Sequence, residues 1–209
     1  MPNEANSAAA SSSAKLAALL RSHLEIERVE LEGHGEVRWH RHSLEEISRQ
    51  RQDEGTVRVL LNGCFDVMHH GHFNALRQAK HIFYQKGFRR VVLVACLHSD
   101  AAIAGQKGPP LMNDEERFAC LNATKWVDEM VTGLPYVAMT PDIADRFQAR
   151  YICHGDDLPV IQGSGSGMYT QAMQEGRFQL LKRTEGVSTT QILQRLLGQL
   201  DDAATPATS

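Results

Sequence analysis

Short apolar runs alternate with longer amphipathic segments over most of the chain. Two runs, "VRVLLNG" at 57–63 and "RRVVLVACL" at 89–97, are rich in Val and Leu. Such runs are typical of strands that are buried on both faces. The segment between them predicts an amphipathic helix that ends at Gly87 and has an apolar face made of Phe73, Leu76, Ala79, Ile82 and Phe83.

The same alternation continues toward the C-terminus. The pattern predicts a helix at 113–124, a strand at 125–131, a helix at 140–148, a strand at 149–155 and a helix at 188–200. Asn113 with Glu116, and Ser188 with Gln191, have the spacing of helix capping boxes. Repeated strand-then-helix order predicts an α/β fold with a doubly wound, mostly parallel sheet.

The ends of the chain differ in composition from this central part. Residues 1–13 are rich in Ala and Ser and predict a disordered tail, as do residues 201–209. Residues 14–55 form an N-terminal extension, and Leu and Ile at helical spacings in its first half predict that it is partly helical. The main domain is therefore predicted at 56–200.

Bulk composition narrows the class of protein. A chain of 209 residues with 42% hydrophobic and 22% charged residues is long enough for one sizeable core. The net charge of −3 argues against a protein that coats nucleic acid, and no apolar run is long enough to span a membrane. The N-terminus lacks a signal-peptide pattern. The four cysteines have no CxxC spacing, which favours buried free thiols in a reducing compartment.

The stretch "LLNGCFDVMHHGHFNALRQA" at 60–79 carries candidate chemistry, because it leads from a strand into a helix. A helix N-terminus after a parallel strand presents free N–H groups that suit a phosphate. His69 and His72 can point to one side of the first turn and donate hydrogen bonds to phosphate oxygens. Two alternatives stay open: a zinc site with His98 or His154 as a third ligand, and solvated surface histidines.

Two motifs identify a family resemblance. The stretch "GCFDVMHHGH" resembles the GxFDxxHxGH signature of the cytidylyltransferases, within the HxGH nucleotidylyltransferase superfamily. The stretch "KRTEGVSTTQIL" at 182–193 resembles the RTEGxST motif of the same family. The resemblance covers roughly residues 57–200 and implies a Rossmann-like nucleotidylyltransferase fold.

The wording of "KGPP", "HGDD" and "KRTEGVSTT" is closer to the ethanolamine-phosphate branch of this family, and to its N-terminal catalytic repeat, than to the choline branch. The resemblance implies transfer of a cytidylyl group from CTP, with Mg²⁺, to phosphoethanolamine, giving CDP-ethanolamine and pyrophosphate. Alternatives are phosphocholine or glycerol 3-phosphate as acceptor, or a single-repeat regulatory or dimerising half of a larger enzyme.

The resemblance also implies roles for individual residues. Three residues would be catalytic, namely His69, His72 and Lys107. The implied CTP-binding residues are Gly63, Cys64, Phe65, Asp66, Gly71, Arg117, His154, Asp156, Asp157, Arg183, Thr184, Gly186, Ser188 and Thr189. Tyr136 would present its ring to the substrate head group through a cation–π contact. No protein-bound metal centre is expected.

Some of these assignments have a structural alternative. Lys107 could be a solvated loop lysine, Asp66 a turn former, and Arg117 a member of a salt bridge on a helix face. Which Asp of the HGDD segment meets the ligand stays open. "GSGSG" at 163–167 does not join a strand to a helix in a first βαβ unit, so we interpret it as a flexible loop and candidate lid.

The expected partners follow from the same resemblance. They are CTP and phosphoethanolamine, with no nucleic acid, no transmembrane segment and a second copy of the chain in a homodimer. The expected location is the cytoplasm, with peripheral association with the endoplasmic reticulum as an alternative.

Overall fold

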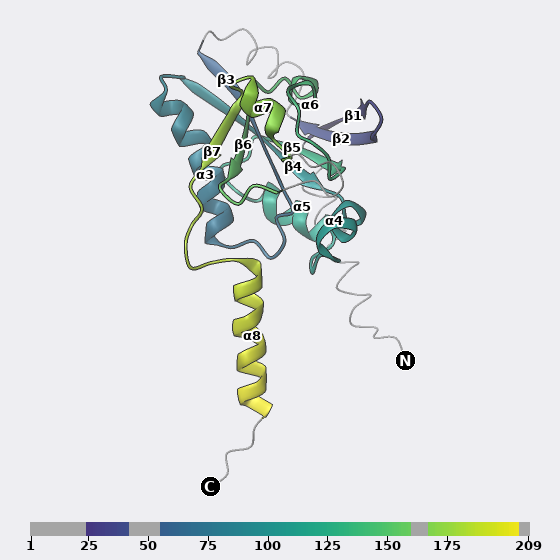
Figure 1. Ribbon diagram of the computed structural model, residues 1–209, viewed down its shortest axis with the longest axis vertical. Helices are drawn as coiled ribbons and strands as arrows, with labels where there is room; N and C mark the ends of the chain where they lie inside the picture. Colours follow the sequence, from purple (N-terminus) through teal and green to yellow (C-terminus); the bar gives the residue numbers. More distant parts are fainter. Residues whose placement is uncertain (1–23, 42–54, 160–166, 205–209) are drawn as a thin grey trace.

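The computed structural model describes residues 24–41, 55–159 and 167–204 (Figure 1). A seven-stranded sheet runs through it in the order β1-β2-β5-β4-β3-β6-β7. The strands are β1 (Glu25–Leu31), β2 (Gly35–Arg41), β3 (Thr56–Gly63), β4 (Arg90–His98), β5 (Glu129–Leu134), β6 (Tyr151–Gly155) and β7 (Phe178–Leu181). The described helices are α3 (His70–Gln85), α4 (Asp100–Lys107), α5 (Asp114–Asn122), α6 (Pro141–Arg146), α7 (Thr170–Gln174) and α8 (Thr189–Ala204).

Strands β3 to β7 are parallel wherever they pair with one another. The chain moves outward from β3 through β4 to β5 and then returns to place β6 on the other side of β3. Ligands in sheets of this kind bind beyond the carboxyl ends of the strands where the order reverses, here between β3 and β6. The predicted doubly wound, mostly parallel α/β fold is confirmed.

Side chains of the central strands alternate between two hydrophobic cores. In β3, Val59 and Leu61 join the core that also holds α3 and α5, whereas Leu60 faces the core that holds α6 and α7. Both sheet faces are therefore covered by helices, and continuous apolar runs result. On α3, Leu76, Ala79 and Phe83 are buried as predicted, but Phe73 is 41% exposed, because it lies in the first turn beyond the edge of the core.

The N-terminal extension corrects one prediction. Within its described part, residues 25–41 form an antiparallel hairpin that pairs through β2 with the edge of β5, so helix is wrong there. The tight turn at 32–34 contains Gly33 and is followed by Gly35, with φ of 75° and 86°, and such glycines favour a hairpin. Residues 1–23 and 42–54 lie outside the described residues, and the domain limit at 56 stays a prediction.

Three smaller expectations also need adjustment. Strand β5 begins at Glu129 and not at Lys125, since Trp126 packs against the core and Asp128 accepts the amide hydrogen of Leu93. The predicted tail at 201–209 is wrong for residues 201–204, which continue α8, whereas 205–209 lie outside the described residues. The four cysteines are free as predicted, but Cys120 is exposed and Cys64 only half-buried. Residues 163–166 of the "GSGSG" segment are not described.

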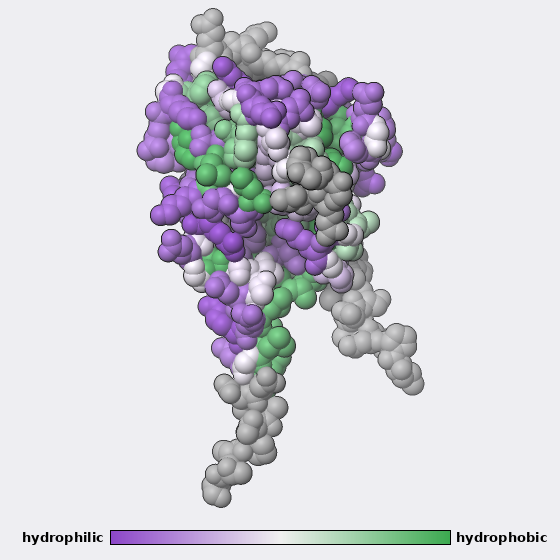
Figure 2. All heavy atoms as spheres, viewed as in Figure 1, coloured by the Kyte–Doolittle hydropathy of each residue, from purple (hydrophilic) through white to green (hydrophobic). Residues whose placement is uncertain are grey.

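Helix α8 extends away from the body of the molecule (Figure 1). Its hydrophobic and hydrophilic residues separate onto two sides (Figure 2). Leu196, Leu197 and Leu200 are more than half exposed on it. Among the described helices, none has the length and apolar content that crossing a bilayer requires.

Candidate active site

The loop that leaves β3 has a constrained backbone. Phe65 and Val67 have φ of 52° and 43°, in the left-handed region that large side chains avoid. Such conformations persist where surrounding contacts hold them, and they cluster at ligand sites. Gly63 permits the turn, because a β-carbon there would lie 3.1 Å from the ring of Phe65.

Two histidines cap the N-terminus of α3 in a reciprocal arrangement. The backbone N–H of Gly71 donates to Nδ1 of His69 over 3.1 Å, and the backbone N–H of His69 donates to Nδ1 of His72 over 3.3 Å. Since both Nδ1 atoms accept, the proton of each neutral imidazole sits on Nε2. The capping contacts thus leave two Nε2–H groups as donors for an anion.

Burial keeps these imidazoles uncharged at neutral pH. It lowers the pKa of His72 to about 4, with nearby His69 contributing in the same direction. The pKa of His69 is also lowered, first by burial and then by the charges of His70 and Arg183. A bound anion would reverse this balance by favouring the imidazolium forms.

Gly71 lets the His69 ring and the Val187 side chain approach the start of α3. A β-carbon at Gly71 would lie 2.9 Å from Cε1 and Nδ1 of His69 and 3.1 Å from a methyl carbon of Val187. A β-carbon cannot lie 2.9 Å from the His69 ring unless the ring moves, and 3.1 Å from Val187 is shorter than an ordinary van der Waals contact. The His-x-Gly-His spacing therefore has a steric reason in this fold.

Asp66 ties three loops together. Its carboxylate accepts hydrogen bonds from the backbone N–H groups of Leu111 and Met112, each over 2.9 Å. Its carbonyl oxygen accepts a hydrogen bond from the hydroxyl of Thr189 at the start of α8. Asp66 therefore organises the site and is more than a local turn former.

The segment 182–189 packs along α3 and closes the site from the other side. Asn74 donates to the hydroxyl of Thr184 over 2.9 Å, and Gln78 exchanges hydrogen bonds with the backbone of Lys182. Ser188 accepts the N–H of Gln191, which confirms the predicted cap of α8. Arg183 lies 3.4 Å from the Asp157 carboxylate and remains half exposed.

These elements enclose a cavity of about 510 Å³. Of the residues predicted to bind or act on substrate, the ones that line it are Gly63, Cys64, Phe65, Asp66, His69, Gly71, His72, Lys107, Tyr136, His154, Asp157, Arg183, Thr184, Ser188 and Thr189. The cavity lies at the carboxyl ends of β3 and β6, where the sheet topology predicts a ligand. Arg117, Asp156 and Gly186 do not line it.

Lys107 is the last residue of α4, and Gly108 follows it with a φ of 87°. Its ammonium lies 5.8 Å from the centre of the Tyr136 ring, within reach of a cation–π contact. Lys107 lies in the segment after β4, and Tyr136 lies in the loop after β5. The structure brings them together on one wall of the cavity.

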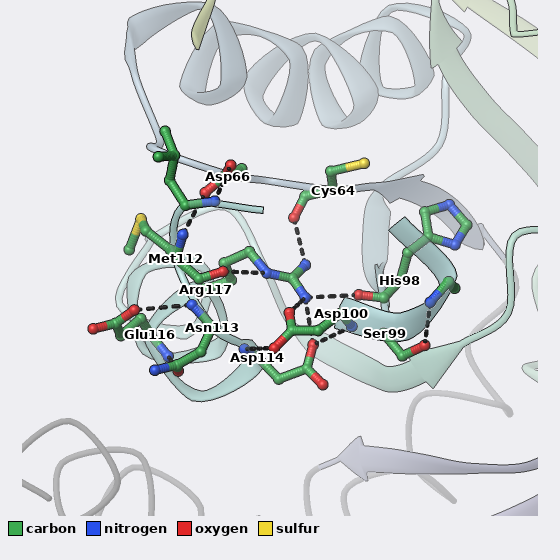
Figure 3. A network of polar contacts seen from close by, with 12 residues as sticks. Cys64, Asp66, His98, Ser99, Asp100, Met112, Asn113, Asp114, Glu116 and Arg117 are labelled. Atoms are coloured by element: carbon green, nitrogen blue, oxygen red, sulfur yellow. Dashed lines mark hydrogen bonds and ion pairs between the residues drawn. The ribbon is translucent and has the colours of Figure 1, made fainter. Parts of the chain in front are cut away.

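Arg117 does not reach the cavity, which corrects the expected contact with phosphate. Its side chain is fully buried and donates to the carbonyl oxygens of Cys64, His98 and Met112 (Figure 3). It also pairs with the carboxylates of Asp100 and Asp114. With its donors occupied, Arg117 fixes the loop after β3 against the starts of α4 and α5.

The HGDD segment divides its residues between cavity and solvent. The Nδ1 of His154 lies 3.1 Å from the carbonyl of Gly155, and burial lowers the pKa of this histidine. Both aspartates are exposed, but only Asp157 lines the cavity, and it folds back over Gly155, where a β-carbon would lie 2.8 Å from its carboxylate oxygen. Asp157 is therefore the better candidate of the two for a ligand contact.

The cavity also contains Asn62, Tyr169 and Thr190, which the sequence did not single out, and His98, which was considered only as a third zinc ligand. Asn62 is a polar residue at the end of an apolar strand, and this position was the only feature of the sequence that could have indicated a role in the site. Tyr169 gave none, since the segment before it has no clear pattern. Within the described residues, no group of three or more His, Cys, Asp or Glu side chains has a metal-binding arrangement.

Several known proteins are similar to this chain in sequence. The cytidylyltransferase-like family matches residues 60–195. The ethanolamine-phosphate cytidylyltransferases of Dictyostelium discoideum and Arabidopsis thaliana are 42% and 45% identical over 141 and 145 residues, each covering 68% of this chain. Choline-phosphate cytidylyltransferase A of Homo sapiens is 33% identical over 159 residues, or 76% of this chain.

The matched regions cover 37%, 32% and 41% of these three relatives, so the chain spans well under half of their length. Within that region, the family match includes both the paired histidines at the start of α3 and the segment that leads into α8. The chain belongs to the cytidylyltransferase-like family.

Proposed function

We propose that this chain transfers the cytidylyl group of CTP to phosphoethanolamine, giving CDP-ethanolamine and pyrophosphate. The observation that carries the proposal is the pair of imidazoles at the N-terminus of α3. Both have Nδ1 occupied by backbone N–H groups and Nε2–H free as a donor, and both line a cavity shared with Lys107 and Arg183. This arrangement suits a triphosphate.

In the proposed reaction, a phosphate oxygen of the acceptor attacks the α-phosphorus of CTP in line with the leaving group. A new bond forms between them, the bond from the α-phosphorus to the bridging oxygen breaks, and pyrophosphate leaves. Such transfers depend on positioning and charge stabilisation. His69 and His72 would donate to the phosphate oxygens, and Lys107 would bridge the phosphates of the two substrates.

The segment before α8 would hold the triphosphate. Arg183 supplies a half-exposed guanidinium, and Thr184, Ser188 and Thr189 supply hydroxyls around the N-terminus of α8. Mg²⁺ would arrive as part of the CTP complex, with phosphate oxygens and water as most of its ligands. Asp157 is the cavity carboxylate best placed to meet it, since both carboxylate oxygens of Asp66 accept backbone N–H groups.

Sequence identity favours phosphoethanolamine over phosphocholine as the acceptor. This chain is 42% and 45% identical to two ethanolamine-phosphate cytidylyltransferases and 33% identical to the human choline-phosphate enzyme. The Tyr136 ring lines the cavity and offers a cation–π contact to an ammonium group, in competition with the ammonium of Lys107, which lies 5.8 Å from the ring centre. Both head groups carry that charge, so the choice between them needs direct measurement.

The test is pyrophosphate release by the full chain with CTP and Mg²⁺, offering phosphoethanolamine, phosphocholine and glycerol 3-phosphate separately. We expect a clear preference for phosphoethanolamine that His72→Ala abolishes. Preference for another acceptor would retain the chemistry and replace the substrate. Binding of CTP without release from any acceptor would overturn the proposal and favour a half that acts only within a larger assembly.

We further propose a homodimer in the cytoplasm. The exposed Leu196, Leu197 and Leu200 on α8 support the first part, and four free cysteines support a reducing compartment. Sedimentation velocity over a range of concentrations tests the dimer. A single species with the mass of one chain at every concentration would contradict it.

A further inference from the structure

The segment that leads from β7 into α8 runs beside α3 and is held there by two amide side chains (Figure 1). Asn74 and Gln78, one turn apart on α3, contact Thr184 and Lys182, which are two residues apart in the segment. The Gln78 amide donates to the carbonyl oxygen of Lys182 over 2.9 Å and accepts its backbone N–H over 3.1 Å. A helix rises about 6 Å over four residues and an extended chain spans about 6.6 Å over two, so both contacts can form at once.

The orientation of the Asn74 amide is fixed by Arg77. Both Nε and Nη2 of Arg77 donate to Oδ1 of Asn74, over 3.1 Å and 2.8 Å. A guanidinium has donors only, so the amide atom that faces it must be the oxygen. The amide nitrogen then faces Thr184 and donates to its hydroxyl oxygen over 2.9 Å. Rotation of the amide by 180° would set its nitrogen against the guanidinium.

This arrangement decides where the Thr184 hydroxyl directs its proton. A hydroxyl has one proton to donate, and the oxygen of this one already accepts from Asn74. The proton therefore points away from Asn74, and none of the described residues accepts it in a hydrogen bond. Thr184 lines the cavity together with Arg183 and Ser188, whereas Asn74 and Arg77 do not line it. The hydroxyl is thus left as a donor on the cavity wall.

We propose that Asn74 and Arg77 are positioning residues that turn the Thr184 hydroxyl proton toward the triphosphate of CTP. Arg77 fixes the amide, the amide fixes the hydroxyl, and only the hydroxyl meets the ligand. A donor that is oriented in advance loses less freedom on binding than one that rotates. The inference rests on the proposed function, because it concerns the triphosphate end of the same cavity. It adds that an amide outside the cavity is a determinant of CTP binding and has little effect on the acceptor.

The test compares Asn74→Leu with the unmodified full chain, because leucine is similar in size and neither donates nor accepts. We expect the Kd from calorimetry and the KM for CTP with Mg²⁺ to rise about 3- to 10-fold, the range of one hydrogen bond, and the acceptor KM to change less than twofold. Gln85→Leu is the matched control, since it adds a leucine at the other end of α3, outside the cavity, and should change neither value. An unchanged Kd for CTP in Asn74→Leu, or equal rises for both substrates, would overturn the proposal.

A double-mutant cycle shows whether the effect passes through the hydroxyl. Thr184→Val removes the hydroxyl and retains the shape of the side chain, so adding Asn74→Leu to it should raise the Kd for CTP no further. Thr184→Ser retains a hydroxyl, and in that background Asn74→Leu should raise the Kd as it does in the unmodified chain. A further rise of full size in the Thr184→Val background would overturn the role through Thr184.

Arg77→Met separates positioning from direct attraction by charge, and it replaces an exposed side chain, so it also serves if Asn74→Leu folds poorly. The Asn74 amide is then free to rotate, and the Kd for CTP should rise, by less than in Asn74→Leu. In the Thr184→Val background Arg77→Met should add nothing. A rise that persists there would show direct attraction to the triphosphate and overturn the role of Arg77, as would no rise in the single variant.

Failure of the proposed function would appear differently, as a lack of pyrophosphate release from phosphoethanolamine by the unmodified chain. The Kd for CTP is measured without an acceptor, so its response to Asn74→Leu and Thr184→Val tests the positioning role whichever acceptor the chain uses.

Discussion

At the scale of single residues, the site depends on close packing between Gly71 and the imidazole of His69. We predict that Gly71→Ala lowers pyrophosphate-releasing activity by at least about 10-fold, since the added methyl group would displace His69 by steric overlap. Activity is measured at saturating CTP and acceptor. Gly198→Ala is the matched control: it lies in α8 with open space around it and should retain full activity. Equal activity of Gly71→Ala and the unmodified chain would contradict the steric argument.

The protonation of His72 should change when the triphosphate binds. The free protein holds its pKa at about 4, so at pH 6 the ring is neutral. Bound phosphates raise that pKa, and the complex therefore takes up protons, up to about one per site, which enter Nδ1 as the backbone N–H of His69 releases it. Calorimetric titration with CTP in buffers of different ionisation enthalpy measures this uptake.

Two variants test whether His72 is the group that takes up the proton. His70 is exposed and does not line the cavity, so His70→Gln should take up the same number of protons as the unmodified chain. His72→Gln should take up fewer. Proton release on binding, or the same uptake in His72→Gln, would refute the assignment.

The residue scale also shows what sequence can and cannot predict here. His69, His72 and Gly71 were predicted because a strand end, a glycine and a helix start are local features. Arg117 was misplaced, because its surroundings come from three separate segments and only the fold shows that the Cys64, His98 and Met112 carbonyls surround it. Asn74 and Thr184 were likewise invisible as a pair, since their contact depends on how the segment before α8 packs along α3.

At the scale of elements, the hairpin β1–β2 pairs with β5 and adds a hydrogen bond to a buried ion pair of the sheet. The Glu129 carboxylate on β5 accepts two hydrogen bonds from Arg58 on β3 and one from the Trp39 indole on β2. Trp39 also packs edge-on against Phe147. Helical spacing of Leu and Ile was misleading here, because the exposed strand β1 carries few apolar residues and because β5, the strand that pairs with β2, is remote in sequence.

We predict that Glu129→Gln lowers the free energy of unfolding by about 2–4 kcal/mol, since it leaves the buried guanidinium of Arg58 without its counter-charge. Urea denaturation measures the change. Glu36→Gln is the control, because Glu36 pairs with Arg28 on the exposed face of the hairpin and should cost at most about 0.5 kcal/mol. Similar losses in both variants would show that the buried ion pair has no special role.

At the scale of the whole molecule, the cavity joins segments that are more than 100 residues apart. The loop after β3 and the segment before α8 meet because β6 returns to the side of β3. The Thr189 hydroxyl then bonds to the Asp66 carbonyl across 123 positions. The alternation of strands and helices predicts a parallel sheet, but only the family resemblance placed these two motifs in one site. Binding at this junction should therefore stabilise the chain as a unit.

We predict that CTP with Mg²⁺, at about 100 times its Kd, raises the free energy of unfolding by about 2.7 kcal/mol. Thermal denaturation with and without ligand measures the shift. At the same CTP concentration, Arg183→Ala should lose most of this gain, because its half-exposed guanidinium lines the cavity and loses only a weak pairing with Asp157 when removed. Arg195→Ala removes the same charge farther along α8, outside the cavity, and should retain the gain. Equal stabilisation of both variants would place the triphosphate elsewhere, whereas loss in Arg183→Ala alone would locate it at the junction between α3 and α8.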